Sequence, residues 1–162
     1  MSNTKHILLQ RGSTVFLRAV IIGAGLIILA LCIFALPVGL RSDATGAYKP
    51  IILGMYGAAI PFFLALKATL KLLGYIDTNK AFSVRSLATL RTIKRCAVAV
   101  ASIFALGSPY IYHVADMDDA PGVLAFALLI IGTSIVIAVF SSVLQKLLAS
   151  ALAIKTENDL TV

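Results

Sequence analysis

Four long runs without a charged side chain dominate this sequence of 162 residues. An α-helix of about 20 apolar residues crosses a hydrocarbon core of roughly 30 Å. With 60% hydrophobic and only 13% charged residues, the chain has little left from which to build a separate soluble domain. The runs therefore predict an all-α integral membrane protein, a four-helix bundle made of two transmembrane hairpins. They are Ala19 to Leu40, Pro50 to Leu66, Cys96 to Ala115 and Ala120 to Gln145, which contain 22, 17, 20 and 26 residues.

The charged residues fall unequally on the two sides that four crossings define. Because Lys and Arg are retained on the cytoplasmic side, we predict that both termini and the middle connection are cytoplasmic in a bacterial inner membrane. The first run is longer than the apolar core of a cleaved signal, about 7 to 15 residues, so we interpret it as a retained anchor. The predicted cytoplasmic side holds Lys5, Arg11, Arg18, Lys67, Lys71, Lys80, Arg85, Arg91, Lys94, Arg95, Lys146 and Lys155 against Asp77, Glu157 and Asp159. The other side holds Arg41 and Lys49 against Asp43, Asp116, Asp118 and Asp119.

Turn and capping residues set the expected bounds of the helices. Pro37 and Gly39 are expected to end the first helix, and Pro50 suits the first turn of the second. Ser83 can cap a helix that begins before the membrane and runs into the third span. The expected transmembrane helices cover about 14–37, 50–73, 90–112 and 121–152, with a cytoplasmic connection over about 74–89.

Pro61 lies in the middle of the second span. A proline there removes one backbone hydrogen bond and predicts a kink. One interpretation is a bend that neighbouring helices absorb, since prolines are common in membrane helices. The other is a hinge or a polar pocket. In the third span, Ala97, Ala101 and Ala105 form a ridge of small residues, which favours close helix packing within one chain or between copies.

Five basic residues beside the membrane are the candidates for a contact surface. Lys67 and Lys71 are four residues apart on one helix face, and Arg91, Lys94 and Arg95 have the spacing i, i+3, i+4 of another. The simpler interpretation is an anchor that attracts anionic lipid at about 1 kcal/mol per charge. The alternative is a surface that recognises an acidic protein. Direct nucleic-acid binding is not expected, because no helix-turn-helix, zinc-finger or aromatic-basic module accompanies these charges.

The second outer connection carries the remaining candidate ligands, His113, Asp116, Asp118 and Asp119. Carboxylates bind hard cations, and a histidine adds pH sensitivity. Their spacing matches no metal site, however, and Asp118 or Asp119 shortly before Pro121 is typical of a capped helix start. We favour the capping interpretation and keep a cation or pH-sensing site as the alternative.

The sequence assigns no catalytic, cofactor-binding or metal-binding residue. The four runs contain no Asp, Glu, Lys or Arg, one of which a proton-coupled transporter usually needs inside the membrane. Neither His6 nor His113 is placed to ligate a haem within the bundle. The hydroxyl groups in the fourth span lack a partner His or Asp that would make them nucleophiles. The polar residues of that span are Thr133, Ser134, Ser141, Ser142 and Gln145.

Two segments resemble a family of small bacterial four-helix membrane proteins, number two-nine-seven-five among the domains of unknown function. The first is the run Leu31 to Pro37 (LCIFALP), which closes the first helix. The second is Asp77 to Ser83 (DTNKAFS), followed by Leu87, Leu90 and Arg91. Members of that family are often encoded beside a small helix-turn-helix regulator, which implies a membrane component that sequesters or senses for a transcription factor.

These observations leave two hypotheses of function. The first is a non-enzymatic membrane protein whose Arg91, Lys94 and Arg95 contact anionic lipid or an acidic face of such a regulator. The second is a small transporter or channel assembled from several copies, in which the Pro61 kink and the hydroxyl groups of the fourth span line a path.

Overall fold

The fold consists of long antiparallel helices. The computed structural model describes residues 2–42, 46–78 and 82–160, and within these ranges the side chains from 14 to 158. The helices are α1 (Ser2–Ala30), a π-helical turn η1 (Leu31–Ala35), α2 (Leu36–Ser42), α3 (Lys49–Asp77), α4 (Val84–Met117) and α5 (Pro121–Leu160). Four candidate spans, Thr14–Ser42, Lys49–Asp77, Val84–Met117 and Pro121–Asn158, are long and apolar enough to cross a membrane. The all-α, four-span architecture predicted from the sequence is therefore confirmed.

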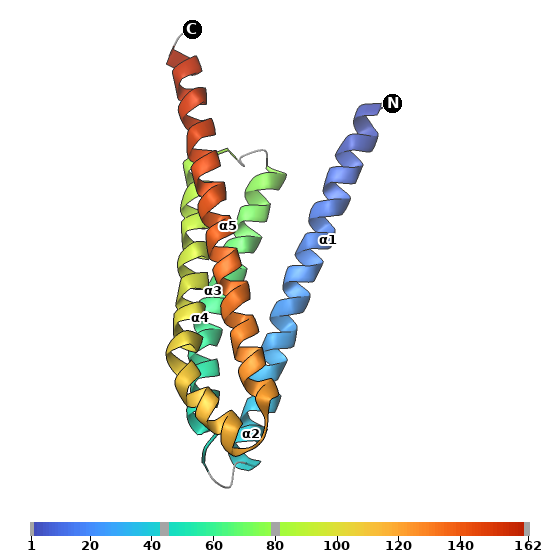
Figure 1. Cartoon of the computed structure of the whole chain (residues 1–162). Coiled ribbons are helices and arrows are strands. Elements are labelled where there is room, and N and C mark those ends of the chain that lie inside the picture. Colours follow the sequence, from blue (N-terminus) through green and yellow to red (C-terminus); the bar gives the residue numbers. More distant parts are fainter. Residues whose placement is uncertain (1, 43–45, 79–81, 161–162) are drawn as a thin grey trace.

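The antiparallel order places both chain ends at one end of the molecule (Figure 1). We call it the basic end, because it holds nine described Lys and Arg side chains against Asp77 and Glu157. The opposite end holds Arg41, Lys49, Asp116, Asp118 and Asp119. The nine basic residues are Arg18, Lys67, Lys71, Arg85, Arg91, Lys94, Arg95, Lys146 and Lys155. Lys5, Arg11, Asp43, Lys80 and Asp159, which also entered the predicted charge balance, lie outside the described side chains.

The first helix does not end at Pro37 and Gly39, contrary to our prediction. The chain stays helical from Ser2 to Ser42, through the π-turn η1 and then α2. A proline inside a regular α-helix clashes with the carbonyl four residues earlier, and the wider π-turn just before Pro37 is a known way to absorb such a disturbance. Gly39 serves packing instead, because a Cβ added there would lie 3.2 Å from Cδ1 of Ile52 on α3.

The π-turn leaves one carbonyl to be satisfied from another helix. The Leu36 N–H donates to the Leu31 carbonyl five residues earlier. The carbonyl of Cys32 would take its own π-helical hydrogen bond from residue 37, which is a proline without an N–H. The Tyr56 hydroxyl of α3 donates to that Cys32 carbonyl at 2.8 Å. This bond links the irregular part of the first span to the second span.

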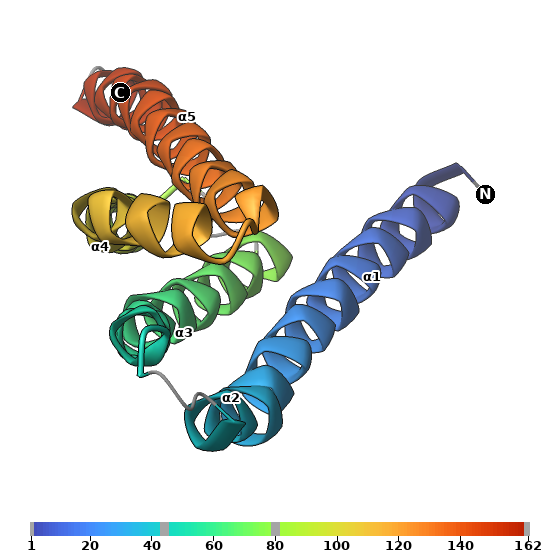
Figure 2. The ribbon, with the colours of Figure 1, turned by 60° about the horizontal axis from the view of Figure 1, so that its bottom comes forward.

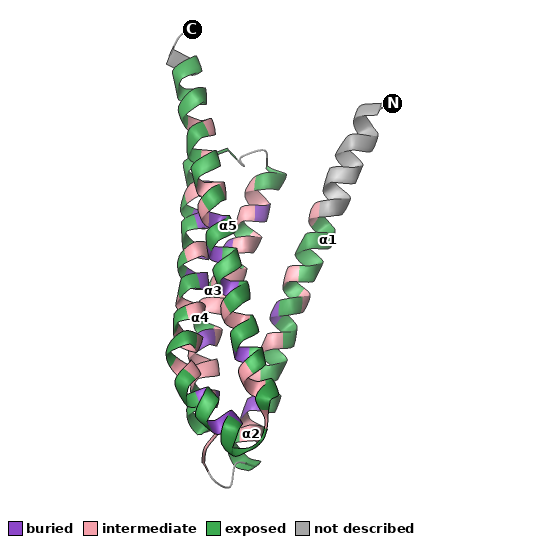
Figure 3. Ribbon diagram, viewed as in Figure 1, coloured by how far each residue is buried: buried purple, intermediate pink, exposed green. Residues whose placement is uncertain are grey.

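The core lies where α3, α4 and α5 meet. The α4–α5 contact is the most extensive, followed by α3–α4, while α1 packs against α3 (Figure 2). Buried residues line this three-helix contact and are sparse on α1 (Figure 3). On α5 the buried positions are small, namely Ala127, Ser134, Ala138 and Ser141. Small side chains let two helices approach closely, which is how helices gain packing energy in lipid.

Two specific contacts stand out where α1 packs against α3. Gly25 is buried, and a Cβ there would lie 2.5 Å from Cδ2 of Leu66, so the glycine makes room for the leucine. Nearer the basic end, Arg18 Nη2 forms an ion pair with Asp77 Oδ2 at 2.7 Å. Most other large apolar side chains of α1 are exposed, as expected for a span whose outer surface contacts lipid.

The remaining helix bounds follow the turn chemistry. α3 begins beside Pro50 and continues through Pro61 to Asp77, four residues beyond the expected end. α4 begins at Val84, and the Ser83 side chain accepts a hydrogen bond from the Ser86 N–H at 3.3 Å, which confirms the predicted cap. α4 also contains Pro109, which frees the carbonyl of Ala105. The Ser108 hydroxyl donates to that carbonyl at 2.8 Å.

The Tyr56 bond makes a first prediction. Tyr56→Phe should lower the free energy of unfolding by about 1 kcal/mol, because it leaves the Cys32 carbonyl without a donor in an apolar surrounding. Unfolding in mixed micelles of a mild detergent and SDS measures this change. Tyr112→Phe, which removes a hydroxyl from an exposed tyrosine of α4, is the matched control. In a Pro37→Ala background, where residue 37 regains an N–H, the cost of Tyr56→Phe should shrink. Equal losses from Tyr56→Phe and Tyr112→Phe would contradict the assignment.

Candidate functional site

The five basic residues predicted as a contact surface all lie at the basic end. Lys67 and Lys71 are exposed on the last turns of α3. Arg91, Lys94 and Arg95 lie on the first turns of α4. The structure thus brings the two groups to the same end, but it does not give them one common face.

Arg91 and Arg95 are both exposed, on the opposite side of α4 from the buried residues Ile93 and Ala97. Neither guanidinium forms an ion pair with a side chain in the described part of the chain. We call these two residues the outward pair. Their fork of N–H donors is available for a carboxylate or a phosphate.

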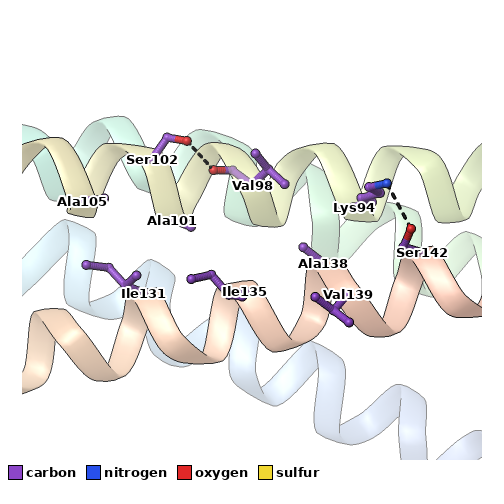
Figure 4. Close-up of a pocket in the computed structure, with 10 residues that line it drawn as sticks. All are labelled: Lys94, Val98, Ala101, Ser102, Ala105, Ile131, Ile135, Ala138, Val139 and Ser142. Carbon is purple, nitrogen blue, oxygen red and sulfur yellow. Dashed lines mark hydrogen bonds between the residues drawn. The ribbon is translucent and has the colours of Figure 1, made fainter.

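Lys94 does not belong to the outward pair, although the sequence predicted that it would share their face. It is half-buried beside α5, and its Nζ donates to Ser142 Oγ at 3.1 Å (Figure 4). Lys94 lies on the edge of that face against which α5 packs, so its surroundings differ from those of Arg91 and Arg95. The bond lies at one end of a groove of about 460 Å³ between α4 and α5.

Apart from Ser102, the rest of the α4–α5 groove is apolar. Ala101 and Ala105 of α4 face Ile131 and Ile135 of α5 across it (Figure 4). The small residues of the ridge predicted on α4 therefore lie in two different surroundings. Ala97 is buried in the core, while Ala101 and Ala105 line this groove.

A second groove of about 510 Å³ lies between α3 and α4. Lys67 and Lys71 line it from α3, and Arg85 lines it from α4. We call it the basic groove. Arg85 was counted in the charge balance of the sequence but not singled out there. Arg85 and Thr92 are seven residues apart and therefore share one face of a helix. This spacing is the one sequence signal for the place of Arg85 in the groove.

The hydroxyl groups of α5 do not share one surface. Ser134 and Ser141 are buried in the helix contact, Thr133 is exposed, and Ser142 accepts from Lys94. The Nε2 atom of Gln145 is buried without a hydrogen-bond partner among the described residues. Pro61 lies within α3, whose α-helix is uninterrupted on both sides of it. A functional hinge at Pro61 stays a prediction.

The acidic connection at the opposite end is shorter than expected. His113 and Asp116 are exposed residues of the last turns of α4, not loop residues. Asp118 is the C-cap of α4, so it ends that helix and does not cap the start of α5. Its Oδ2 atom accepts a hydrogen bond from the Tyr48 hydroxyl at 2.6 Å. Nearby, the Tyr110 hydroxyl donates to the Ala47 carbonyl at 2.9 Å, so both bonds hold the connection before α3 against α4.

Asp119 has a backbone role in this turn. Its φ is +50°, in the left-handed region, and the Ala120 N–H donates to the Ala115 carbonyl at 2.9 Å. This is the Schellman arrangement that ends many helices, usually with glycine at the left-handed position. Within the described residues, no group of three or more His, Cys, Asp or Glu side chains could hold a metal ion. The local geometry therefore explains Asp118 and Asp119 without a cation.

This geometry makes a second prediction. Asp119→Gly should raise the free energy of unfolding by up to about 1 kcal/mol, because glycine adopts a positive φ without strain, whereas Asp119→Val should lower it. Thermal unfolding in detergent, with and without millimolar Ca²⁺, measures both. If Ca²⁺ stabilised the wild type and Asp119→Gly abolished that effect, the capping role would not be sufficient and a cation site would be needed.

Comparisons with known proteins support the family resemblance. The family model described as "Protein of unknown function (DUF2975)" matches residues 37–162, from Pro37 to the last residue. The chain is also 48% identical over 160 residues to the "Uncharacterized membrane protein YoaS" of Bacillus subtilis (strain 168), covering 95% of this chain and 100% of that protein. No solved structure matches it. The chain therefore belongs to the DUF2975 family of membrane proteins.

Proposed function

We propose that this protein is a non-enzymatic docking platform of the bacterial cytoplasmic membrane, which binds an acidic face of a small cytoplasmic regulator. The outward pair, Arg91 and Arg95, carries the proposal. Two exposed guanidinium groups without ion-pair partners in the described part of the chain form a ready site for carboxylates. The resemblance to this family, whose members are often encoded beside a helix-turn-helix protein, favours such a regulator as the partner.

The end of α5 supports this proposal. α5 continues to Leu160 and extends beyond the ends of α3 and α4 at the basic end (Figure 1). The 14 residues after Lys146 span about 21 Å along a helix, enough to reach well beyond the headgroups. Ile154 is 64% exposed on this extension, next to Lys155. An exposed apolar residue beside a cation suits contact with a protein surface.

The docking proposal requires the basic end to face the cytoplasm, which is a third prediction. In a Cys32→Ala, Cys96→Ala background, Asp116→Cys should react with a membrane-impermeant maleimide on intact protoplasts. Glu157→Cys should react only after the membrane is permeabilised, because the excess of Lys and Arg keeps the basic end inside. The reverse labelling pattern would rule out a cytoplasmic partner for the outward pair.

Binding of the partner gives a fourth prediction. The intact protein, extracted from native membranes in mild detergent, should retain a small helix-turn-helix protein. Arg91→Gln with Arg95→Gln should weaken binding by up to about 30-fold, at up to about 1 kcal/mol for each exposed ion pair. Mass spectrometry identifies the retained protein, and titration of the purified pair at low and high salt measures its affinity. The loss should be largest at low salt, where screening is weakest.

Lys94 is left unchanged in this test because its bond to Ser142 gives it a separate structural role. The matched control is Lys67→Gln with Lys71→Gln, which removes the same charge from a different face of the same end. Equal weakening by the two double variants would mean that net charge, not the outward pair, attracts the partner. Retention of the regulator by the Arg91, Arg95 variant at full affinity would disprove the assignment.

A small oligomeric transporter or channel is the second candidate. The half-buried Lys94 at the end of the α4–α5 groove favours it, since a cation near a membrane interior often marks a substrate path. The separate orientations of Thr133, Ser134 and Ser142 give it less support, because they do not line one path in a single chain. Ion or substrate flux in proteoliposomes that Lys94→Met abolishes would favour transport over docking.

A further inference from the structure

The basic groove between α3 and α4 combines three cations with hydroxyl groups and an apolar floor. Lys67, Lys71 and Arg85 line it together with the hydroxyl-bearing Tyr75 and Thr92. Its volume of about 510 Å³ is in the range of small-molecule sites. The groove and the outward pair involve different residues, so an inference about the groove does not rest on the proposed docking function.

The charge of the groove is not neutralised within the described residues. Lys67, Lys71 and Arg85 form no ion pair there. Asp77, the acidic residue at the end of α3, is already paired with Arg18 of α1 at 2.7 Å. The Lys71 ammonium lies 6.0 Å from the centre of the Tyr75 ring, which keeps it beside the groove while leaving its donors available. Three cations that line one concave surface and have no ion-pair partner in the described part of the chain favour an anionic ligand.

The long axis of the groove crosses from polar to apolar surroundings. Because α3 and α4 are antiparallel, Tyr75 and Arg85 lie near their connection, whereas Leu64 and Thr92 lie further into the spanning segments. Ala68 and Ala88 leave the floor shallow and apolar between these two ends. A ligand that fills this groove would have a negative charge near the connection and an apolar part toward the spans. A phospholipid has both parts in this order.

We propose that the basic groove binds one anionic phospholipid, with its headgroup phosphate held by Lys67, Lys71 and Arg85. The Arg85 guanidinium suits two phosphate oxygens at once, and the two ammonium groups act as point charges. The Tyr75 hydroxyl can donate to a phosphate or glycerol oxygen, whereas the Thr92 hydroxyl already donates to the Ala88 carbonyl at 3.2 Å and offers only its oxygen as an acceptor. An acyl chain would lie along Leu64 and Ala68. Basic pockets between transmembrane helices are a recurrent solution for retaining such headgroups.

Native mass spectrometry of the full chain in mild detergent tests this proposal. After incubation with phosphatidylglycerol, the wild type should retain one lipid, whereas phosphatidylcholine should be retained at least about tenfold less. Lys67→Gln, Lys71→Gln and Arg85→Gln together should reduce retention of phosphatidylglycerol by at least about tenfold. The matched control removes three charges outside the groove, by Arg91→Gln, Arg95→Gln and Lys146→Gln, and should retain the lipid as the wild type does.

A variant that fills the groove without changing its charge tests whether lipid retention depends on the shape of the groove or on its charge alone. Ala88 is exposed on the groove, so Ala88→Phe should fill the groove, keep every charge and leave the fold intact. It should displace the lipid as effectively as the triple groove variant, while circular dichroism and elution volume stay unchanged. Retention of the lipid by Ala88→Phe would overturn the proposal, as would equal losses in the groove triple and the control triple.

Two further outcomes have defined meanings. If glycerol phosphate, which lacks acyl chains, displaced the lipid and raised the melting temperature equally, the site would be one for a soluble phosphate and the phospholipid assignment would fail. If the groove triple lost the lipid but still bound the regulator, while the Arg91, Arg95 variant did the reverse, both assignments would be supported separately. Loss of lipid binding alone would leave the docking proposal intact.

Discussion

Hydrocarbon offers no hydrogen bond to a peptide group, and this single constraint explains the irregular parts of the structure. A proline inside a span leaves one carbonyl without its helical donor. That carbonyl must accept a hydrogen bond from another group, or it remains exposed to lipid at a cost in free energy. Pro37 is accommodated by a π-turn, and the Tyr56 hydroxyl then donates to the Cys32 carbonyl at 2.8 Å. Pro109 frees the Ala105 carbonyl, which the Ser108 hydroxyl satisfies at 2.8 Å. In the first case the donor comes from another helix, so satisfying the backbone also fixes how the first span meets the second.

Helix geometry also places the cations of the basic end into groups with different surroundings. α4 carries Arg91 and Arg95 on its exposed side, Lys94 on the side of α5, and Arg85 on the side of α3. Residues three and four apart share a helix face, but a neighbouring helix on either side divides that face. From net charge alone, all of these cations would be interpreted as an anchor that attracts anionic lipid. Their surroundings suggest instead a surface contact, an interhelical bond and a ligand groove.

The sequence predicted the large features because they follow from local rules. Run length fixes the number of spans, and the Ser83 cap and the Pro50 start follow from turn chemistry. It failed at Pro37 and Gly39, since a π-turn and a donor from α3 rescue a helix that local rules would end. It also placed His113 and Asp116 in a loop, although α4 continues to Met117. Lys94 bonds to Ser142, and Lys67 lines the same groove as Arg85, through contacts between segments distant in the sequence. A periodic pattern in the sequence does not predict such contacts.

The distribution of polar groups fits the proposed recognition at the basic end better than a path through the single chain. A path needs polar groups facing one another across the whole membrane, and here Ser134 and Ser141 are packed into the α4–α5 contact. The groove beside them has an apolar lining apart from Lys94, Ser102 and Ser142. By contrast, the outward pair lies on the first turns of α4, and the basic groove lies between these turns and the last turns of α3, at the level where headgroups and water would meet. Because α4 carries Arg85 as well as Arg91 and Arg95, the proposed lipid and the proposed partner would bind within about two to three helical turns of each other without sharing a residue.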